Sequence, residues 1–412
     1  MAGRVVVIGG GVVGTSTALS LADRGFSVEL IEAGTVGGGC SHGNCGYLCP
    51  SHVRPLAVPG AVRGAISAWL AGSGALRIAP RFDPTLWRWL WSFARRCRAP
   101  LAEESSRGRH ALLNSSRALY RRLETRGFEG ELDETGLLLV YRSEREFEAH
   151  ARTAELLKKE FAIPTESFAG EALTDFEPTL LAGLAGGWWY PEDAQLHPDR
   201  VMASLRALAE GAGVQVREHT PVEGLVVEGS RIVAARTASG DREADHFVLA
   251  AGSLTPRLAG EVGLRLPIQP GKGYSITMAP PSRVPARPMV FEDHHVAVTP
   301  FRNTFRLGST MEFAGYDRSL SPDRIGLLRR SAAAHLIDPG GEALEEWWGW
   351  RPMTPDDLPC IGRAPELKNL HVAAGNGMIG LSSAPATGEL LAELIAGEKP
   401  HIDPRPYALD RF

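Results

Sequence analysis

Residues 4–32 read RVVVIGGGVVGTSTALSLADRGFSVELIE, and this stretch decides the fold. The apolar run over residues 5–8 predicts a buried parallel strand, and the glycines that follow predict a tight turn. A helix then runs to Gly25, and a second apolar strand over residues 28–31 closes at Glu32. Strand, glycine turn, helix, strand and terminal acid together predict a dinucleotide-binding βαβ unit.

Each glycine of the G-x-G-x-x-G spacing has a separate physical task. Gly9 permits the tight turn, Gly11 lets the backbone approach a pyrophosphate, and Gly14 lets the helix pack on the strand. The helix N-terminus offers free N–H groups to the phosphates, and Glu32 offers acceptors to a ribose diol. An ADP-containing cofactor follows, with NAD and FAD both open at this point. Further contact candidates here are Val12, Val13 and Ala33.

A second strand–glycine–helix unit follows near the C-terminus. Residues 370–397 read LHVAAGNGMIGLSSAPATGELLAELIAG, which predicts a strand over 370–374, a tight turn and a helix from Ser382 or Ser383. In flavoproteins such a helix N-terminus faces the N1/C2=O edge, where the reduced flavin carries negative charge. An ordinary βα turn is the alternative. The residues placed at the cofactor are Gly375, Gly377, Met378, Ile379, Gly380, Leu381 and Ser382.

A third segment lies between these two. Residues 247–253 read FVLAAGS, an apolar strand ending in Ala250, Ala251 and Gly252, where many FAD proteins close the nucleotide-binding sheet. Upstream, the pattern predicts a helix over 198–211, then a strand over 214–217 and an antiparallel pair split at residues 228–230. Val222 would lie beside the adenine in such a unit.

Taken together, these segments resemble the FAD-dependent oxidoreductases of the D-amino acid oxidase, glycine oxidase and sarcosine oxidase superfamily, over nearly the whole chain. The bacterial D-amino acid dehydrogenases are the most similar branch. The motifs that carry this are GVVG at 11–14, KGYS at 272–275, G-x-R-P-x-T-P-D at 349–356 and L-P-x-I-G at 358–362.

The resemblance implies FAD as cofactor and oxidative deamination of D-amino acids to 2-oxo acids and ammonia. A hydride would pass from the α-carbon to flavin N5, and a quinone or dye-type acceptor would take the electrons. Three alternatives stay open: a glycine- or sarcosine-type amine oxidase using O2, a D-proline or D-hydroxyproline dehydrogenase, and a non-catalytic flavin-binding subunit of a larger complex.

Residues 40–52 read CSHGNCGYLCPSH, a density of cysteine and histidine that raises the question of a metal. The spacing lacks the Cys-x2-Cys knuckle of zinc sites, so no metal is expected, and the thiols of Cys40, Cys45 and Cys49 are interpreted as small fillers. By resemblance this loop runs under the flavin ring, with a covalent His42–flavin bond as a minor alternative. The implied contacts are Cys40, Ser41, Asn44, Gly46, Tyr47 and Leu48.

Three residues are candidates for the substrate site. Arg351 ends the strand-like segment WWGWR and offers the bidentate fork that a carboxylate needs, in a position where the family has an arginine of that role. Tyr274 is a candidate hydroxyl donor, with a packed strand tyrosine as the alternative. His52 is expected either at the substrate pocket or on a solvated loop. No general base is required once the amine is neutral.

The fold class expected is α/β: a Rossmann-like FAD-binding domain and an α+β substrate domain with a mostly antiparallel sheet, each domain threaded more than once. Helices are predicted within 84–97 and 109–127, and strands at 136–141 and within 264–315. The expected segments are 1–54, 193–262 and 347–412 for FAD binding, and 55–192 and 263–346 for substrate.

Composition limits the partners. The 412-residue chain has 44 Lys and Arg against 48 Asp and Glu, a net charge of −4, which argues against nucleic acid. Five cysteines do not suggest a disulfide scaffold, and the early strand leaves no room for a signal peptide. A cytoplasmic protein is expected, with the inner face of the cell membrane as an alternative. Trp87, Trp89 and Trp91 among arginines suit a core helix, which we expect, or a membrane surface.

Overall fold

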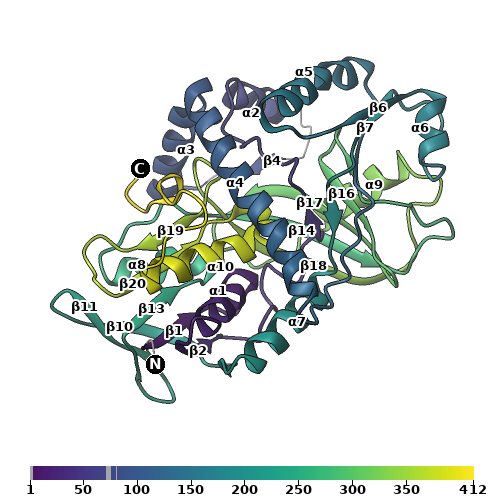
Figure 1. The fold of residues 1–412 in the computed structure, drawn as a ribbon. Helices are drawn as coiled ribbons and strands as arrows, with labels where there is room; N and C mark the ends of the chain where they lie inside the picture. The colour runs from purple at the N-terminus through teal and green to yellow at the C-terminus, as the bar shows by residue number, and fades with distance from the viewer. Residues whose placement is uncertain (1–2, 71–75, 80) are drawn as a thin grey trace.

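The computed structural model describes residues 3–70, 76–79 and 81–412, and they form two large sheets with helices and two smaller sheets around them (Figure 1). The first sheet has the strand order β19-β20-β13-β1-β2-β9. Its strands pair in parallel, apart from the antiparallel pair of β19 with β20. Their bounds are β1 (Arg4–Ile8), β2 (Ser27–Ile31), β9 (Gln215–Arg217), β13 (His246–Leu249), β19 (Cys360–Arg363) and β20 (Leu370–Ala374).

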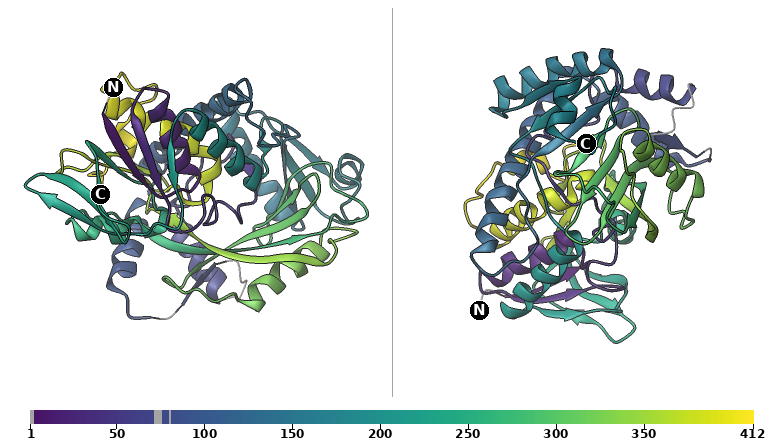
Figure 2. Two further views of the ribbon diagram at one scale, coloured as in Figure 1. Left: turned by 90° about the horizontal axis from the view of Figure 1, so that it is seen from below. Right: turned by 90° about the vertical axis from the view of Figure 1, so that its right-hand side faces the viewer.

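Both faces of this sheet are covered, as its continuous apolar strands require. One face packs on α1 (Val12–Ala22), α4 (Ala99–Glu124), α7 (Pro198–Gly211) and α10 (Gly380–Ala396). The other face packs on α8 (Thr255–Glu261) and the meander of β10 (Val222–Glu228), β11 (Arg231–Thr237) and β12 (Arg242–Glu243). Figure 2 shows the N-terminal strands and the C-terminal helix α10 together at one end of the molecule.

The second sheet is mostly antiparallel, with the order β18-β14-β17-β16-β15-β5-β7-β6, and β4 pairs with β17. The strands are β4 (Leu76–Ile78), β5 (Leu137–Tyr141), β6 (Glu166–Ala169), β7 (Gly186–Tyr190), β14 (Gln269–Met278), β15 (Met289–Phe291), β16 (Val296–Pro300), β17 (Phe305–Phe313) and β18 (Ala343–Met353). The helix α9 (Pro322–Ala333) packs on one face of this sheet.

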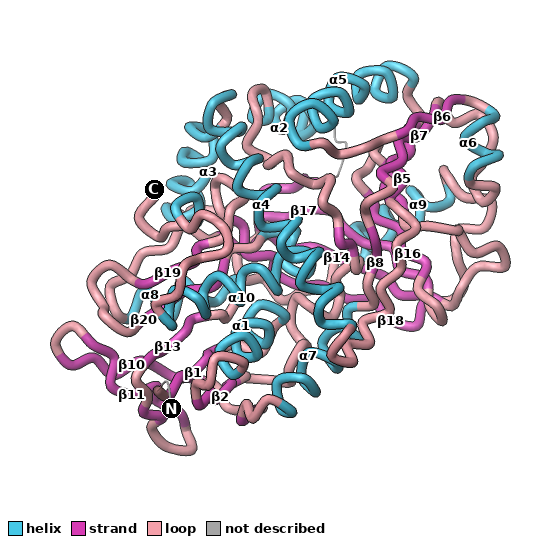
Figure 3. The backbone as a smooth tube through the Cα atoms, in the orientation of Figure 1, coloured by secondary structure: helices cyan, strands magenta, loops and turns pink. Residues whose placement is uncertain are grey.

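The remaining elements connect the two sheets or lie beyond them (Figure 3). They are β3 (Tyr47–Leu48) paired with β8 (Ala194–Gln195), the helices α2 (Ala61–Leu70), α3 (Pro84–Arg96), α5 (Glu144–Phe161) and α6 (Glu171–Phe176), and the 3-10 turns η1 (Gly252–Leu254), η2 (Gly377–Ile379) and η3 (Arg405–Tyr407). Among the described residues, no helix is both long enough and apolar enough to cross a bilayer.

The structure shifts three of the expected boundaries. Strand β18 pairs with β14 up to Met353, so Trp347–Arg351 belong to the antiparallel sheet rather than to the FAD-binding segment 347–412. Helix α10 begins at Gly380, because the turn η2 runs directly into it, and not at Ser382 or Ser383. Helix α4 begins ten residues earlier than the predicted 109–127 segment, at Ala99.

The tryptophans of α3 divide between core and surface. Trp89 is buried against Phe93 and Phe313, and its indole N–H donates to the carbonyl of Met353. Trp87 and Trp91 are 59% and 62% exposed, so the expectation of a fully core-facing helix is wrong for these two. Trp87 and Trp91 are four residues apart and share one face of the helix, whereas Trp89, two residues from each, lies on another face.

Candidate functional site

A cavity of about 1740 Å³ runs between the two sheets. Its walls come from the carboxyl ends of β1, β13 and β20 on one side and from β14, β16, β17 and β18 on the other. Ligands of α/β sheets bind at such carboxyl ends, and this volume exceeds the roughly 300–1,000 Å³ of a usual small-molecule pocket. The cavity therefore suits a long cofactor together with a second, smaller ligand.

The glycine turn after β1 forms the first end of the cavity. Gly9 has φ +113°, and a Cβ on it would lie 2.5 Å from the carbonyl oxygen of Ala250. A Cβ on Gly14 would lie 1.8 Å from the carbonyl oxygen of Gly9, so helix α1 packs on the strand only with glycine there. Gly11 is different: the one neighbour near its Cβ position is the Ser41 hydroxyl at 3.5 Å, and the residue faces the cavity.

Glu32 lies at the same end, on the cavity wall. Its carboxylate accepts hydrogen bonds from the backbone N–H of Gly10 at 2.7 Å and of Gly34 at 2.8 Å. These bonds fix the carboxylate beside the glycine turn and leave further lone pairs for a ribose diol. The other lining residues of this end that the sequence predicts are Val12, Val13, Ala33, Val222, Ala250, Ala251 and Gly252.

The turn after β20 lies along the middle of the cavity. Asn376 is buried, and its amide nitrogen donates to the hydroxyls of Ser383 at 3.0 Å and Thr387 at 2.9 Å. Its amide oxygen is buried without a partner, although Asn376 lines the cavity. An unpaired buried acceptor is costly, so it favours a ligand with a donor at this point. The predicted residues that line this part are Gly375, Gly377, Met378, Ile379, Gly380, Leu381 and Ser382.

The loop after β2 crosses the cavity and is clamped from both sides. The Arg306 guanidinium donates to the carbonyl oxygens of His42 and Asn44, each at 2.7 Å. The His42 imidazole lies between Asp199, at 2.6 Å from Nδ1, and Glu345, at 2.9 Å from Nε2. The hydrogen bond to Asp199 is the main cause that raises the pKa of His42 to about 9, against partial burial. Both ring nitrogens are engaged in these bonds, which leaves neither for the covalent flavin link.

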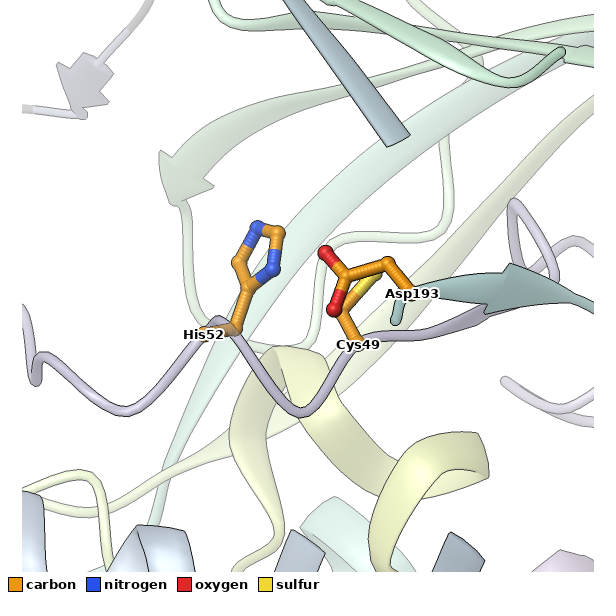
Figure 4. Close-up of side chains that lie close together, drawn as sticks. All are labelled: Cys49, His52 and Asp193. Atoms are coloured by element: carbon orange, nitrogen blue, oxygen red, sulfur yellow. The ribbon is translucent and has the colours of Figure 1, made fainter. Parts of the chain in front are cut away.

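Cys49, His52 and Asp193 lie close together farther along this loop (Figure 4). Their potential ligand atoms fall within 4.8 Å of one another. The Asp193 carboxylate already accepts the backbone N–H and the hydroxyl of Ser51, and burial raises its pKa to about 7. Burial is also the main reason that the pKa of His52 falls to about 4, so its imidazole is neutral at neutral pH. The cavity lining includes His52 and the three loop cysteines, Cys40, Cys45 and Cys49. Cys49 is buried among apolar side chains, whereas the other three residues are partly exposed.

Arg351 faces the cavity from β18. A Cβ on Gly273 of the adjacent β14 would lie 2.4 Å from the guanidinium, so Arg351 lies flat over that glycine. One guanidinium nitrogen donates to the carbonyl oxygen of Thr310 at 2.6 Å. Thr310 has φ +58°, where the register of β14 against β17 shifts, and its buried hydroxyl has no partner. The fork of Arg351 is thus held in place at the wall of the cavity.

Four predicted contacts lie outside the cavity lining. Tyr274 is on the opposite face of β14 from Gly273, because side chains alternate along a strand, and its hydroxyl donates to Glu312 at 2.7 Å. Leu48 is buried in the core beside β1, and a Cβ on Gly46 would meet the carbonyl oxygen of Leu196 at 2.1 Å. Gly14 serves helix packing, as above. Tyr274 thus has the position of the packed strand tyrosine that the sequence left open, and Gly14 has the packing role predicted for it. For Leu48 and Gly46, direct contact with the cofactor stays a prediction.

Arg109, Glu292 and His295 are among the polar cavity residues that the sequence prediction missed. Arg109 is buried within α4, and its guanidinium donates to the carbonyl oxygens of His52 and Asp357. Glu292 and His295 flank the tight turn between β15 and β16 and pair at 3.2 Å. An arginine at an apolar position of a predicted helix was a usable signal for Arg109. The turn EDHH at residues 292–295 gave no signal of a cavity position, since charged residues are common in surface turns.

The comparisons with known proteins identify the family. The family model for DAO, FAD dependent oxidoreductase, matches residues 4–394, so the chain belongs to the DAO family of FAD-dependent oxidoreductases. A D-amino acid dehydrogenase of Paramagnetospirillum magneticum is 34% identical, covering 99% of each chain. One of Rhizorhabdus wittichii is 31% identical, over 99% of this chain and all of the relative.

Solved structures agree with this fold. Glycine oxidase from Geobacillus kaustophilus is 26% identical, with a TM-score of 0.77 over 100% of this chain and 99% of that one. L-proline dehydrogenase from P. horikoshii is 22% identical, with a TM-score of 0.74 over 99% and 97%. The mixed α/β architecture predicted from the sequence is confirmed.

The residues present fit the FAD that the family uses. The cavity volume of about 1740 Å³ can hold a dinucleotide, Gly11 leaves its wall open at the helix N-terminus, and Asn376 has an unsatisfied acceptor farther along. Glu32 could hold the ribose, the α1 N-terminus the pyrophosphate, and the loop at 40–47 with the turn at 375–382 the ring system.

Proposed function

We propose that this protein is a D-amino acid dehydrogenase that oxidises the Cα–N bond and passes electrons to an acceptor other than O2. The observation that carries this is Arg351, a guanidinium held over Gly273 at the cavity wall. A carboxylate-bearing substrate needs such a planar fork. The names of the relatives at 31% and 34% identity, over 99% of this chain, support the D-amino acid substrate.

FAD, when bound, would accept the two electrons and the hydrogen leaving the substrate α-carbon. The chain's own task is to bind and orient the substrate. Arg351 would hold the carboxylate, and Trp347 and Gly349, on the same face of β18, would shape the wall beside it. His52 is neutral at neutral pH and lines the same cavity, so it would accept a hydrogen bond from the substrate amine without adding charge.

The acceptor we propose is a lipid-soluble quinone that enters along α2 and α3. An apolar arm of the cavity lies between these helices, and its lining includes Val62, Ile66, Leu86, Leu90 and Phe93. Ile66 and Trp87, which also line this arm, and Trp91 are more than half exposed, so the apolar lining continues onto the surface. Arg95 lies over the Trp91 ring at 4.5 Å. An exposed apolar surface with aromatic and cationic groups suits the interface of an anionic membrane.

The function is tested by anaerobic bleaching of the purified holoenzyme's flavin absorbance with paired D- and L-amino acids, glycine and sarcosine. Rapid bleaching by D-enantiomers, followed by reoxidation by a short-chain quinone faster than by O2, is the expected result. Bleaching by glycine or sarcosine with stoichiometric peroxide in air would favour the oxidase that the glycine oxidase fold also accommodates. No bleaching by any of these would contradict the proposal and leave a flavin-binding subunit.

The membrane surface has its own test. Co-sedimentation with vesicles containing anionic lipid is compared for the wild type and the Trp87→Ser/Trp91→Ser double variant. Binding that the double variant loses, with flavin bleaching retained, is expected. Equal sedimentation of both proteins, or no sedimentation of either, would remove the membrane from the proposal while leaving the D-amino acid chemistry untouched.

A further inference from the structure

Four cavity-lining residues lie on one row across the antiparallel sheet: Gly273 of β14, Thr310 of β17, and His295 and Glu292 beside β16 and β15. Each residue of the row is the immediate chain neighbour of a residue that pairs directly with the adjacent strand. Those pairs are Tyr274 with Ser309, Ser309 with Val296, and Val296 with Phe291. Residues on one row and one face of a sheet present their side chains to the same ligand.

The two ends of this row carry opposite charges. At one end the Arg351 guanidinium lies over Gly273 and donates to the Thr310 carbonyl oxygen at 2.6 Å. At the other end the backbone N–H of Glu292 donates to the carbonyl oxygen of Val140 at 3.0 Å, which ties Glu292 to strand β5. The sheet therefore fixes the Arg351 end, and this backbone bond to β5 fixes Glu292 at the start of the turn after β15.

The spacing of the row sets the length of ligand that can reach both ends. Gly273 and Glu292 are three strand intervals apart, and strands lie about 4.8 Å apart, so the separation is about 14 Å. The Arg351 guanidinium lies over Gly273, and the Glu292 carboxylate extends from its backbone to His295. The gap that a ligand bridges is therefore shorter than this backbone separation by two charge-assisted contacts of about 3 Å each and by part of the glutamate side chain. An amino acid with an extended side chain of lysine or arginine length matches this span.

The charge at the far end is suited to a cation. Of the three carboxylates among the described residues that line the cavity, Glu32 is held by backbone amides at the glycine turn and Glu261 belongs to α8, on the far face of the parallel sheet. Glu292 is the one on the antiparallel sheet. Hydrogen bonding to His295 is the main influence opposing burial, and the pKa of Glu292 lies below its usual value.

The groups that face Glu292 come from several elements. They are His295 of the same turn, His52 of the loop after β3, His150 of α5, Tyr141 of β5 and Tyr190 of β7. Burial lowers the pKa of His52 and of His150, so both are mainly neutral at neutral pH. The pKa of His295 is raised by Glu292, with smaller contributions from Glu146 and Asp293. The Arg109 guanidinium is directed to backbone carbonyls instead.

Resting on the function proposed above, we propose that Glu292 selects substrates whose side chain ends in a positive charge. The carboxylate of such a substrate binds Arg351, its extended side chain follows the row, and its cationic end replaces His295 at the Glu292 carboxylate. The His295 side chain is 67% accessible, so it can turn away from Glu292 without breaking a packed core. A small neutral side chain reaches only the Arg351 end of the row.

Binding of two matched, non-reactive carboxylates to the holoenzyme tests this without turnover. Flavin absorbance is titrated with 6-aminohexanoate and with hexanoate, which differ in the terminal ammonium. Wild type is expected to bind 6-aminohexanoate about tenfold more tightly, and Glu292→Gln to lose that difference. The exposed Glu155 of α5 provides the matched control, since Glu155→Gln removes the same charge away from the cavity. Equal or weaker binding of 6-aminohexanoate by wild type would overturn the inference.

The pH dependence adds a second readout. As pH rises through the raised pKa of His295, the imidazole loses its proton and no longer competes for Glu292. The ligand ammonium stays charged because its own pKa is near 10.4. The preference for 6-aminohexanoate is expected to increase over this range in wild type and to be flat in His295→Gln. A preference in wild type that falls with pH would contradict the assigned competition.

Turnover distinguishes this inference from the function on which it rests. The ratio of kcat/KM for D-lysine to that for D-norleucine is expected to drop about tenfold in Glu292→Gln and to persist in Glu155→Gln. If wild type oxidises D-norleucine but shows no preference for D-lysine, the side-chain inference fails and the dehydrogenase stands. If hexanoate perturbs the flavin yet neither amino acid reduces it, both proposals fail.

Discussion

The two ends of the cavity are built in different ways. The nucleotide end is a contiguous stretch in which backbone and missing side chains form the wall: Gly9, Gly11 and Gly14 leave space, and Glu32 is held by amides. The sheet end is assembled from strands far apart in the chain, and its wall carries charged side chains such as Arg351 and Glu292. The nucleotide end can thus be formed by residues close together in the sequence. The residues of the substrate end are brought together by the pairing register of distant strands.

The largest effect is expected from Gly14→Ala, which breaks the nucleotide end. The new Cβ would fall 1.8 Å from the Gly9 carbonyl oxygen, so α1 must move away from β1. We expect a loss of about 3 kcal/mol or more in the free energy of unfolding, and purification without FAD. Gly260→Ala, in helix α8 with open space around its Cβ position, is the control and should retain both. Full FAD content in Gly14→Ala would contradict the packing described here.

Arg351→Met tests the opposite end. Removing the guanidinium should raise the apparent KM for a D-amino acid by about 100-fold or more, while the flavin spectrum is unchanged. Gly273→Ala should also raise the apparent KM although the guanidinium charge is retained. Its new Cβ would lie 2.4 Å from the Arg351 guanidinium and would displace it. Steady-state kinetics and a flavin absorbance spectrum of each variant decide it. Wild-type kinetics in Arg351→Met would remove Arg351 from the substrate site.

His42 joins the two ends, and its effect depends on pH. Because Asp199 and Glu345 raise its pKa from 6.5 to about 9, its contribution to stability is fully present below pH 6.5 and is lost as pH rises through 9. His42→Gln should lower the free energy of unfolding by about 1–2 kcal/mol at pH 6 and by much less at pH 10. Urea unfolding of both proteins at the two pH values measures this. A gap that grows with pH would have the wrong sign for this ion pair.

The smallest effect is expected from Glu32→Gln. The amide retains one oxygen for the Gly10 or Gly34 N–H but loses the negative charge and the second acceptor. FAD affinity of the refilled apoprotein should fall about fivefold, equivalent to about 1 kcal/mol. An unchanged dissociation constant would show that the carboxylate serves the turn alone.

The sequence predicts the nucleotide end well because its determinants are local. The glycine spacing, the apolar strands and Glu32 lie within 32 residues, and the antiparallel pair at 222–237 follows from its turn. Arg351 was found through its motif, and it faces the cavity. Whether Tyr274 or Gly273 faces the same way depends on which face of β14 turns inward. That face is set by pairing with β17 and β18, which local sequence does not specify.

Glu292 and His295 show the same limit from another side. Their turn is four polar residues between two short strands, a pattern that equally suits a solvated hairpin. They reach the cavity because β15 lies between β5 and β16, and β5 comes from a segment more than 140 residues earlier. Exposure of Trp87 and Trp91 was likewise missed, because apolar composition alone does not tell a core face from a surface that binds something else.

The threading of the chain has a consequence for biosynthesis. Strand β1 pairs with β13, and β13 with β20, so the parallel sheet is complete only after Leu370–Ala374 has been made. At about 5–20 residues per second, the interval between β1 and β20 lasts roughly 20–70 s on the ribosome. During that time an apolar strand edge lacks its neighbour: first the edge of β1 until β13 is made, and then the edge of β13 until β20 is made. This makes the nascent chain a client for holding chaperones and puts productive collapse near the end of translation.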